Sequence, residues 1–197
     1  MRGVEMICGK KVGLFGGSFD PVHHGHLILA RDAMESLGLD KVVFIPAGVS
    51  PHKLEQPPAR ADLRVAMLEA AVAGVERFEV DRSEVEREGP SYTIETVRRL
   101  ISRDPGTEFH YFIGDDNIAA LDTWHEIDEL RRLVRFVVLS RHGIDAGAGV
   151  PVITRRVHIS SSDIRNRVAA GLPVRYLLPD NVCDIIQRHG LYRNERP

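Results

Sequence analysis

Short apolar runs alternate with amphipathic stretches along most of the chain. Continuous apolar runs of this kind indicate buried strands, whereas apolar residues at helical spacing indicate amphipathic helices. The predicted strands are Val12–Phe15, Val42–Pro46, Phe78–Val80, Phe109–Ile113, Phe136–Leu139 and Val152–Thr154. The predicted helices are Gly25–Leu37, Arg60–Ala73, Thr93–Ser102, Trp124–Leu133, Ser162–Ala170 and Asp180–His189.

This alternation of strands and helices predicts an α/β fold. Strands that are apolar throughout are typical of a parallel sheet with both faces covered, so we expect a Rossmann-like, doubly wound parallel sheet with helices on both faces. Such a sheet binds its ligand at the carboxyl ends of its strands, near a switch in strand order. The proline-rich segment 47–58 and the glycine-rich segment 143–151 are expected to be loops within one domain, residues 1–197. Residues 1–10 are expected to be a disordered lead, with Met1 and Met6 both candidate starts.

Charge and composition argue against several classes of protein. The 26 basic and 28 acidic residues give a net charge of −2, so we expect no nucleic-acid binding through an overall basic surface. No apolar run reaches the roughly 18 residues of a membrane helix, and the N-terminus lacks an apolar core of signal-peptide length. Cys8 and Cys183 lie far apart and outside any metal-binding spacing, which favours a cytoplasmic protein without disulfides.

The first predicted strand ends in a glycine turn that opens onto a helix, with the sequence Gly-Gly-Ser-Phe-Asp-Pro-Val-His-His-Gly-His over residues 16–26. Glycines let the backbone approach a ligand closely, and the start of a helix offers unpaired N–H groups to an anion. His23 and His26 add two imidazoles at the same place. The pattern indicates a site for the phosphates of a nucleotide. Alternatively, the histidines cap the helix, or they form a metal site with Asp20 and His24.

A second phosphate-binding element is predicted at the start of a later helix, with the sequence Ser-Ser-Ser-Asp-Ile-Arg over residues 160–165. A serine that precedes a helix leaves amides and hydroxyls facing outward, where the helix dipole favours an anion. Arg165, one turn further on, adds a fixed positive charge and a fork of donors. The alternative is an ordinary helix cap with a solvated arginine.

These elements, with Pro51-His52-Lys53, Gly89-Pro90-Ser91-Tyr92-Thr93, Thr123-Trp124-His125 and the segment 159–165, follow one another in a familiar order. The chain resembles the bacterial nicotinate-nucleotide adenylyltransferase family, within the nucleotidyltransferases that carry a His-x-Gly-His motif. The resemblance implies a nucleotidyltransferase-type fold. It also implies adenylyl transfer from ATP to nicotinate mononucleotide, which gives deamido-NAD and pyrophosphate in NAD biosynthesis.

The resemblance implies a set of site residues. The phosphate nucleophile of this reaction is already ionised at neutral pH, so catalysis requires alignment and neutralisation of charge rather than a strong base. Mg²⁺ is expected to accompany ATP, without a metal site built by the protein. The implied catalytic residues are His23, His26 and Arg165; the ATP-binding residues are Gly16, Gly17, Ser18, Phe19, Gly25, Asp116, Ser160, Ser161 and Ser162; and the substrate-binding residues are Lys53, Thr93 and Trp124.

Four of these positions also have an ordinary structural interpretation. The resemblance assigns ring stacking to Trp124 and contact with the substrate carboxylate to Thr93, but a core aromatic and a helix cap are the alternatives. Lys53 is the implied phosphate contact on the proline-rich loop, or else a solvated surface lysine. Asp116 matches the family's aspartate, or caps a helix with Asp115. Asp115 departs from the family, where a small residue is usual, and a second acid near phosphates is unfavourable unless it points away.

Other features are expected to be structural. The acidic residues at 84, 86 and 88 indicate an exposed charged loop, and the C-terminal helix is expected to pack on the sheet.

Two rival functions stay open. One is the same chemistry on another phosphate acceptor, such as nicotinamide mononucleotide or phosphopantetheine. The other is a nucleotide-binding regulatory module without turnover. The sequence is also compatible with a homo-oligomer.

Overall fold

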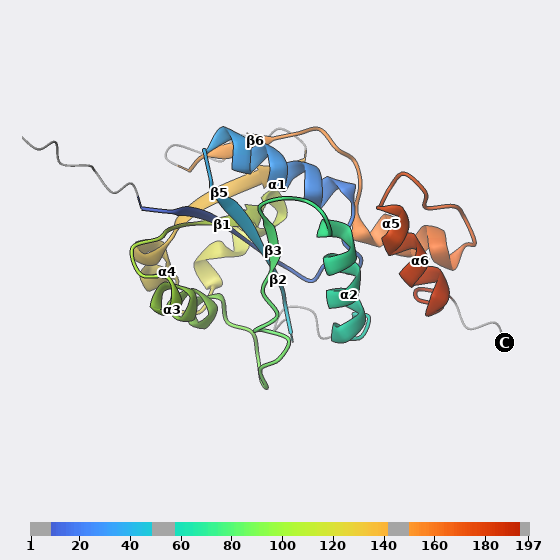
Figure 1. The fold of residues 1–197 in the computed structure, drawn as a ribbon, viewed down its shortest axis with the longest axis horizontal. Coiled ribbons are helices and arrows are strands. Elements are labelled where there is room, and N and C mark those ends of the chain that lie inside the picture. The colour runs from blue at the N-terminus through green and yellow to red at the C-terminus, as the bar shows by residue number, and fades with distance from the viewer. Residues whose placement is uncertain (1–8, 49–57, 142–149, 194–197) are drawn as a thin grey trace, which may run out of the picture.

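The computed structural model describes residues 9–48, 58–141 and 150–193. Its centre is a sheet of six parallel strands in the order β3-β2-β1-β4-β5-β6 (Figure 1). This confirms the predicted α/β fold with a parallel sheet. Every predicted strand is found, with ends that move by no more than two residues. The strands are β1 (Lys11–Gly17), β2 (Lys41–Pro46), β3 (Phe78–Val80), β4 (Glu108–Gly114), β5 (Arg135–Ser140) and β6 (Val152–Thr154).

The predicted helices are also found, but one begins later than expected. The helix predicted from Trp124 starts at Ile127, because Glu126 has left-handed backbone angles (φ 51°) that interrupt a right-handed helix. A 3₁₀ helix, η1 (Asp115–Thr123), was not predicted and occupies the segment between β4 and Trp124. The helices are α1 (His24–Ser36), α2 (Ala61–Val72), α3 (Thr93–Arg103), α4 (Ile127–Leu133), α5 (Ser161–Ala169) and α6 (Asp180–Arg188).

Hydrophobic side chains form one core on each face of the sheet. Successive residues of a strand point to opposite faces, so Leu14 and Phe15 of β1 belong to different cores. Leu14 packs with residues of α3 and α4, and Phe15 packs with residues of α1 and α2. Helices therefore cover both faces, as the apolar strands predicted.

Helix α6 lies beyond α2 rather than directly on the sheet, as Figure 1 shows at the C-terminal end of the chain. We expected it to pack on the sheet. Because α1 and α2 already cover that face, Val182 and Ile186 of α6 extend the core outward from α2 instead. Of the expected disordered lead, Gly9 and Lys10 precede β1 and the rest lies outside the described residues.

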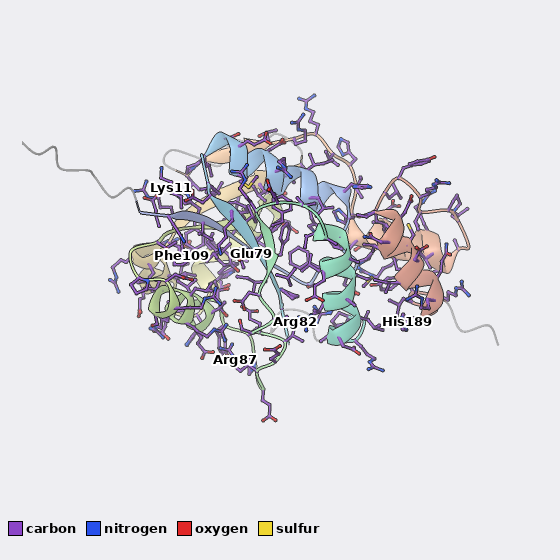
Figure 2. All side chains as sticks on the ribbon, in the orientation of Figure 1. Lys11, Glu79, Arg82, Arg87, Phe109 and His189 are labelled. Atoms are coloured by element: carbon purple, nitrogen blue, oxygen red, sulfur yellow. The ribbon has the colours of Figure 1, made fainter. Side chains whose placement is uncertain are left out.

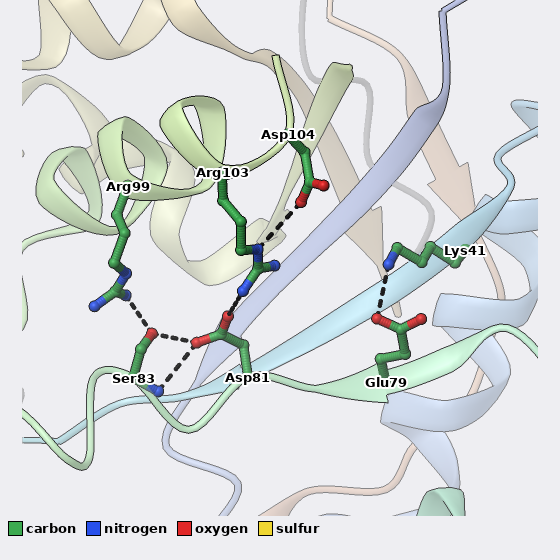
Figure 3. A network of polar contacts seen from close by, with 7 residues as sticks. All are labelled: Lys41, Glu79, Asp81, Ser83, Arg99, Arg103 and Asp104. Carbon is green, nitrogen blue, oxygen red and sulfur yellow. Dashed lines mark hydrogen bonds and ion pairs between the residues drawn. The ribbon is translucent and has the colours of Figure 1, made fainter. Parts of the chain in front are cut away.

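The loop after β3 is attached to α3 by a polar network. Asp81 accepts hydrogen bonds from the N–H of Ser83 over 3.0 Å and from Arg103 over 3.1 Å, and Arg99 donates to the Ser83 hydroxyl (Figure 3). The side chains of Arg82 and Arg87 lie along the segment that follows β3 (Figure 2).

The expectation of an exposed loop is wrong for Glu84. Its carboxylate is buried (7% exposed) and accepts a hydrogen bond from Thr96 of α3 over 2.7 Å. Burial raises the pKa of Glu84, with the hydroxyl of Thr96 acting in the opposite direction. Glu86 and Glu88 are exposed, as predicted.

The strand order reverses between β1 and β4. The chain proceeds outward from β1 through β2 to β3, then returns to β4 on the other side of β1. A crevice forms at such a switch point, outside the carboxyl ends of the two central strands. The glycine turn after β1 and the acidic pair after β4 both lie at this edge. Among the described residues, no helix is long and apolar enough to span a membrane.

Candidate active site

Two cavities lie at this edge of the sheet. The first, which we call the histidine cavity, has a volume of about 390 Å³ and combines the β1–α1 turn with the start of α5. The second, the tryptophan cavity, has a volume of about 410 Å³ and lies toward α3 and η1. Ser18 lines both and is where they meet. The histidine cavity is lined by Ser18, Phe19, Asp20, His23, His26, Pro58, Asp116, Arg141, Ser160, Ser161, Ser162 and Arg165.

His23 is the residue that immediately precedes α1, and it is almost fully buried, with 1% of its surface exposed. Burial lowers its pKa from 6.5 to about 3, with nearby Arg141 acting in the same direction, so the ring is neutral at pH 7. Its Nδ1 is a buried atom without a hydrogen-bond partner of normal geometry in the described part of the chain. A buried polar atom without a partner is costly unless a ligand or water satisfies it.

The two motif histidines are arranged as a stacked pair. Their ring centroids are 3.7 Å apart and the rings are nearly parallel, inclined by 22°. The backbone N–H of His23 donates to Nδ1 of His26 over 3.3 Å. A Cβ on Gly25 would lie 3.0 Å from Nδ1 of His23, so the glycine between them leaves room for the buried ring. Gly25 therefore supports the histidines rather than lining a cavity.

The serine-started helix is bonded directly to the glycine turn. Ser160 caps α5 by accepting the N–H of Asp163 over 3.1 Å, as a serine at that position predicts. The Ser161 hydroxyl donates to the carbonyl of Pro21 over 2.9 Å. Arg165 donates to the carbonyl of Asp20 over 2.7 Å. Two segments that are distant in sequence are thus in direct contact and line one cavity.

Asp115 and Asp116, the acidic pair after β4, have different surroundings. Oδ2 of Asp115 accepts the Ser140 hydroxyl over 2.9 Å and the N–H of Arg141 over 3.2 Å. Asp115 therefore faces the end of β5, and its neighbour Asp116 lines the histidine cavity. Asp115 thus has hydrogen-bond donors of its own. One of them is the backbone N–H of Arg141, a residue that also lines the histidine cavity.

The tryptophan cavity has an aromatic wall and a polar wall. Trp124 is half-buried and stands edge-on to Tyr111 and Phe136, at centroid distances of 5.8 Å and 6.3 Å. Thr93 is the first residue of α3, and its hydroxyl lies 3.5 Å from that of Tyr111. The cavity is lined by Gly16, Gly17, Ser18, Ala47, Glu84, Ser91, Tyr92, Thr93, Tyr111, Phe112, Ile113, Gly114, Asn117, Thr123, Trp124 and His125.

Gly16 and Gly17 both line the tryptophan cavity, and neither lines the histidine cavity. Their expected contact with ATP stays a prediction. A Cβ on Gly16 would lie 2.2 Å from the hydroxyl of Tyr111, so this glycine allows the close approach of a buried tyrosine. Phe19, the expected ATP contact, lines the histidine cavity with left-handed backbone angles (φ 46°).

Lys53 lies outside the described residues. Every other predicted site residue except Gly25 lines one of the two cavities. The alternative metal site is not supported in the ranges that the structure describes, since they hold no group of three or more His, Cys, Asp or Glu side chains able to bind a metal ion.

Sequence reasoning missed Arg64 of α2, which is buried beneath the glycine turn. Its guanidinium is 1% exposed and donates to the carbonyls of Ser18, Ala59 and Gly48, over 2.8, 3.0 and 3.3 Å. It also missed Tyr192, whose hydroxyl donates to Oδ1 of Asp20 over 2.6 Å. An arginine in the middle of an apolar helical pattern was the available signal for Arg64. The partners of Tyr192 are too distant in sequence to be predicted.

Comparison with known proteins identifies the family. Residues 14–167 match the cytidylyltransferase-like family. A probable nicotinate-nucleotide adenylyltransferase of Geobacillus thermodenitrificans (strain NG80-2) is 46% identical over 185 residues, which cover 92% of this chain and 86% of that protein. The chain belongs to the nicotinate-nucleotide adenylyltransferase family. This adenylyltransferase is therefore a nucleotidyltransferase of NAD biosynthesis.

More distant proteins agree with the assignment. A probable nicotinate-nucleotide adenylyltransferase of Rubrobacter xylanophilus (strain DSM 9941 / JCM 11954 / NBRC 16129 / PRD-1) is 40% identical to this adenylyltransferase, over 93% of this chain and 92% of that protein. The solved nicotinic acid mononucleotide adenylyltransferase of Plasmodium falciparum, complexed with NaAD, has a TM-score of 0.76 at 18% identity, over 93% of this chain and 97% of that chain. That likeness shows that the two proteins share the fold.

Proposed function

We propose that ATP binds with its phosphates in the histidine cavity and that nicotinate mononucleotide binds in the tryptophan cavity. The observation that carries this assignment is that the two cavities meet at Ser18. A phosphate that attacks the α-phosphorus of ATP must approach within contact distance, so donor and acceptor need adjoining compartments. The products are deamido-NAD and pyrophosphate.

The histidine cavity supplies donors suited to a triphosphate. His23 is neutral, as its lowered pKa implies, so it acts through an N–H donor rather than as a cation. Next to it, His26 provides a second imidazole at the same wall. Arg165, in the middle of α5, and Arg141, directly after β5, line the cavity with fixed charges suited to the departing pyrophosphate. We assign alignment of the α-phosphate to the histidines and binding of the leaving group to the arginines.

Mg²⁺ is proposed to enter with ATP and to stay on its phosphates. Mg²⁺ usually keeps several waters and binds through one or two carboxylates together with substrate phosphates. Asp116 is the carboxylate that fits this role, because it lines the histidine cavity and is exposed. Asp20 fits less well, because its Oδ1 already accepts two hydrogen bonds. The ion would neutralise phosphate charge that the two arginines leave uncompensated.

The start of α3 supports an acid rather than an amide as the acceptor's ring substituent. Thr93 is the first residue of that helix, and the leading N–H groups of a helix have no partner within it. Together with the helix dipole they favour a carboxylate over a neutral amide. Trp124, half-buried opposite, offers a flat surface to the pyridine ring.

Pyrophosphate release from ATP and Mg²⁺ tests the proposal, with nicotinate mononucleotide and nicotinamide mononucleotide compared side by side. We expect a clear preference for the acid, and quenching of the fluorescence of Trp124, the single tryptophan, when the acid binds. A large preference for the amide, or for phosphopantetheine, would overturn the acceptor assignment. Nucleotide binding without pyrophosphate release for any acceptor would instead indicate a regulatory module.

A further inference from the structure

Asp20 is a buried residue that lines the histidine cavity. The residue is 7% exposed, and Oδ1 accepts hydrogen bonds from the hydroxyl of Tyr192 over 2.6 Å and from the N–H of Ala59 over 3.2 Å. Oδ2 lies 4.0 Å from the guanidinium of Arg165. Tyr192 and Ala59 therefore hold the Asp20 carboxylate at Oδ1. Its other oxygen, Oδ2, is the one nearest Arg165, which lines the histidine cavity.

The distance between Asp20 and Arg165 is long for such a pair. A carboxylate and a guanidinium that are free to approach each other form hydrogen bonds of about 2.7–2.9 Å, often in pairs. Arg165 instead donates to the main-chain carbonyl of Asp20 over 2.7 Å and to Ser162 Oγ over 3.3 Å. Both donors to the Asp20 side chain are on Oδ1, whereas Oδ2 is the oxygen that lies 4.0 Å from Arg165.

Tyr192 is suited to holding the Asp20 carboxylate and has no other evident role. It lines neither cavity, and it is partly buried against the core that contains residues of α1, α2 and α6. Burial and the neighbouring Asp20 raise the pKa of its hydroxyl, so the group stays protonated and donates at neutral pH.

We propose that Tyr192 is a positioning residue that holds the Asp20 carboxylate back from Arg165, so that the charge of Arg165 is available to the triphosphate. Without the tyrosine hydroxyl, the carboxylate turns toward Arg165 and competes with phosphate for it. The inference rests on the proposed function, because it takes Arg165 to bind the departing pyrophosphate.

The first test is Tyr192→Phe, which removes one oxygen and leaves the ring in place. We expect the KM for ATP to rise about five- to tenfold, the range that one hydrogen bond represents, with the KM for nicotinate mononucleotide unchanged. The thermal midpoint, measured alongside, shows that the variant is folded. The matched control is Tyr176→Phe, since Tyr176 lies in the same part of the chain but is 80% exposed. Its kinetics should equal those of the wild type.

The second test repeats Tyr192→Phe in an Asp20→Asn background. Asparagine keeps an oxygen that can accept the two hydrogen bonds but has no charge to compete for Arg165. We therefore expect Tyr192→Phe to change the ATP KM less than about twofold there, whatever effect Asp20→Asn has alone. An equal effect in both backgrounds, or an equal rise in both substrates' KM values, would overturn the proposal, because a purely structural role moves them together.

An Arg165→Met variant separates this inference from the proposed function. If the variant turns over normally, Arg165 does not bind phosphate and the proposed function of that residue fails. If the variant loses activity while Tyr192→Phe is unaffected in ATP KM, the positioning role alone is refuted. If both lose ATP affinity, Tyr192→Phe should have no further effect in the Arg165→Met background.

Discussion

Arg64 donates a hydrogen bond of 2.8 Å to the carbonyl of Ser18, across 46 residues of sequence. Ser18 is the residue that both cavities share, so a buried guanidinium fixes the border between the two proposed binding sites. The same group holds the carbonyls of Gly48 and Ala59. Arg64 therefore holds the residue at which the two cavities meet, without lining either of them.

Arg64→Met should destabilise the protein strongly, because three carbonyls lose their donor in a buried place. We expect a loss of at least about 3 kcal/mol in the free energy of unfolding, measured with urea. Arg64→Lys keeps the charge but not the fork of donors, so it should be intermediate in stability. Arg60→Met is the control: Arg60 immediately precedes the same helix, α2, with its side chain 79% exposed, and should be unaffected. Wild-type stability of Arg64→Met would contradict the role given to this arginine.

His26→Ala should lower kcat by roughly 100- to 1000-fold, the usual effect of removing one donor that stabilises a transition state. The release of pyrophosphate from ATP measures the change. His24→Ala is the matched control, because His24 is adjacent in the motif but lines neither cavity and should keep activity. Full activity in His26→Ala would contradict the mechanism.

The buried His23 should make stability depend on pH. Its pKa is about 3 in the folded protein and 6.5 when unfolded, so between these values the unfolded chain binds a proton that the folded protein does not. The free energy of unfolding therefore decreases as the pH falls below 6.5, by at most about 1.4 kcal/mol per pH unit from this group.

His23→Gln isolates this effect, since glutamine does not titrate. Urea unfolding between about pH 7 and pH 5 should show a shallower dependence on pH in the variant than in the wild type. The difference between the two slopes excludes the contributions of other groups. Equal slopes would mean that the histidine takes up a proton in the folded protein much as it does in water.

Gly16→Ala should disturb the tryptophan cavity, because its methyl group would overlap the hydroxyl of Tyr111, 2.2 Å away. Overpacking of this kind costs about 1–3 kcal/mol, and we also expect a higher KM for nicotinate mononucleotide. In a Tyr111→Phe background the nearest remaining atom is a ring carbon 3.2 Å away, so much of the loss should be recovered. A thermal melt and acceptor kinetics on the wild type, the two single variants and the double variant measure this. The absence of any recovery would show that another contact limits residue 16.

The sequence was sufficient for elements whose cause is local. A strand such as Phe109–Ile113 is apolar over its whole length, and Ser160 caps a helix through its nearest neighbours, so each could be predicted from a few adjacent residues. The motif with His23 and His26 is local in the same sense. Its site roles stay proposals that only kinetics can test.

The sequence was not sufficient where the cause is distant along the chain. Glu84 is buried because Thr96 on α3 gives it a donor, and nothing near residue 84 indicates that contact. The direction of Asp115 depends on donors at the end of β5, 25 and 26 residues away. Tyr192 meets Asp20 across 172 residues. In each case the type of side chain was known from the sequence, and only the fold supplied its partner.

The hydrogen bonds from Arg165 and Tyr192 to Asp20 can form only late in the synthesis of the chain. All six strands of the sheet end by Thr154, so a nascent chain has its entire scaffold before the serine helix leaves the ribosome. At that stage Asp20, in the turn after β1, still lacks its partners Arg165 and Tyr192, which lie 145 and 172 residues further along the chain. A chain that stopped after β6 would lack both of these contacts with Asp20, although its sheet would be complete.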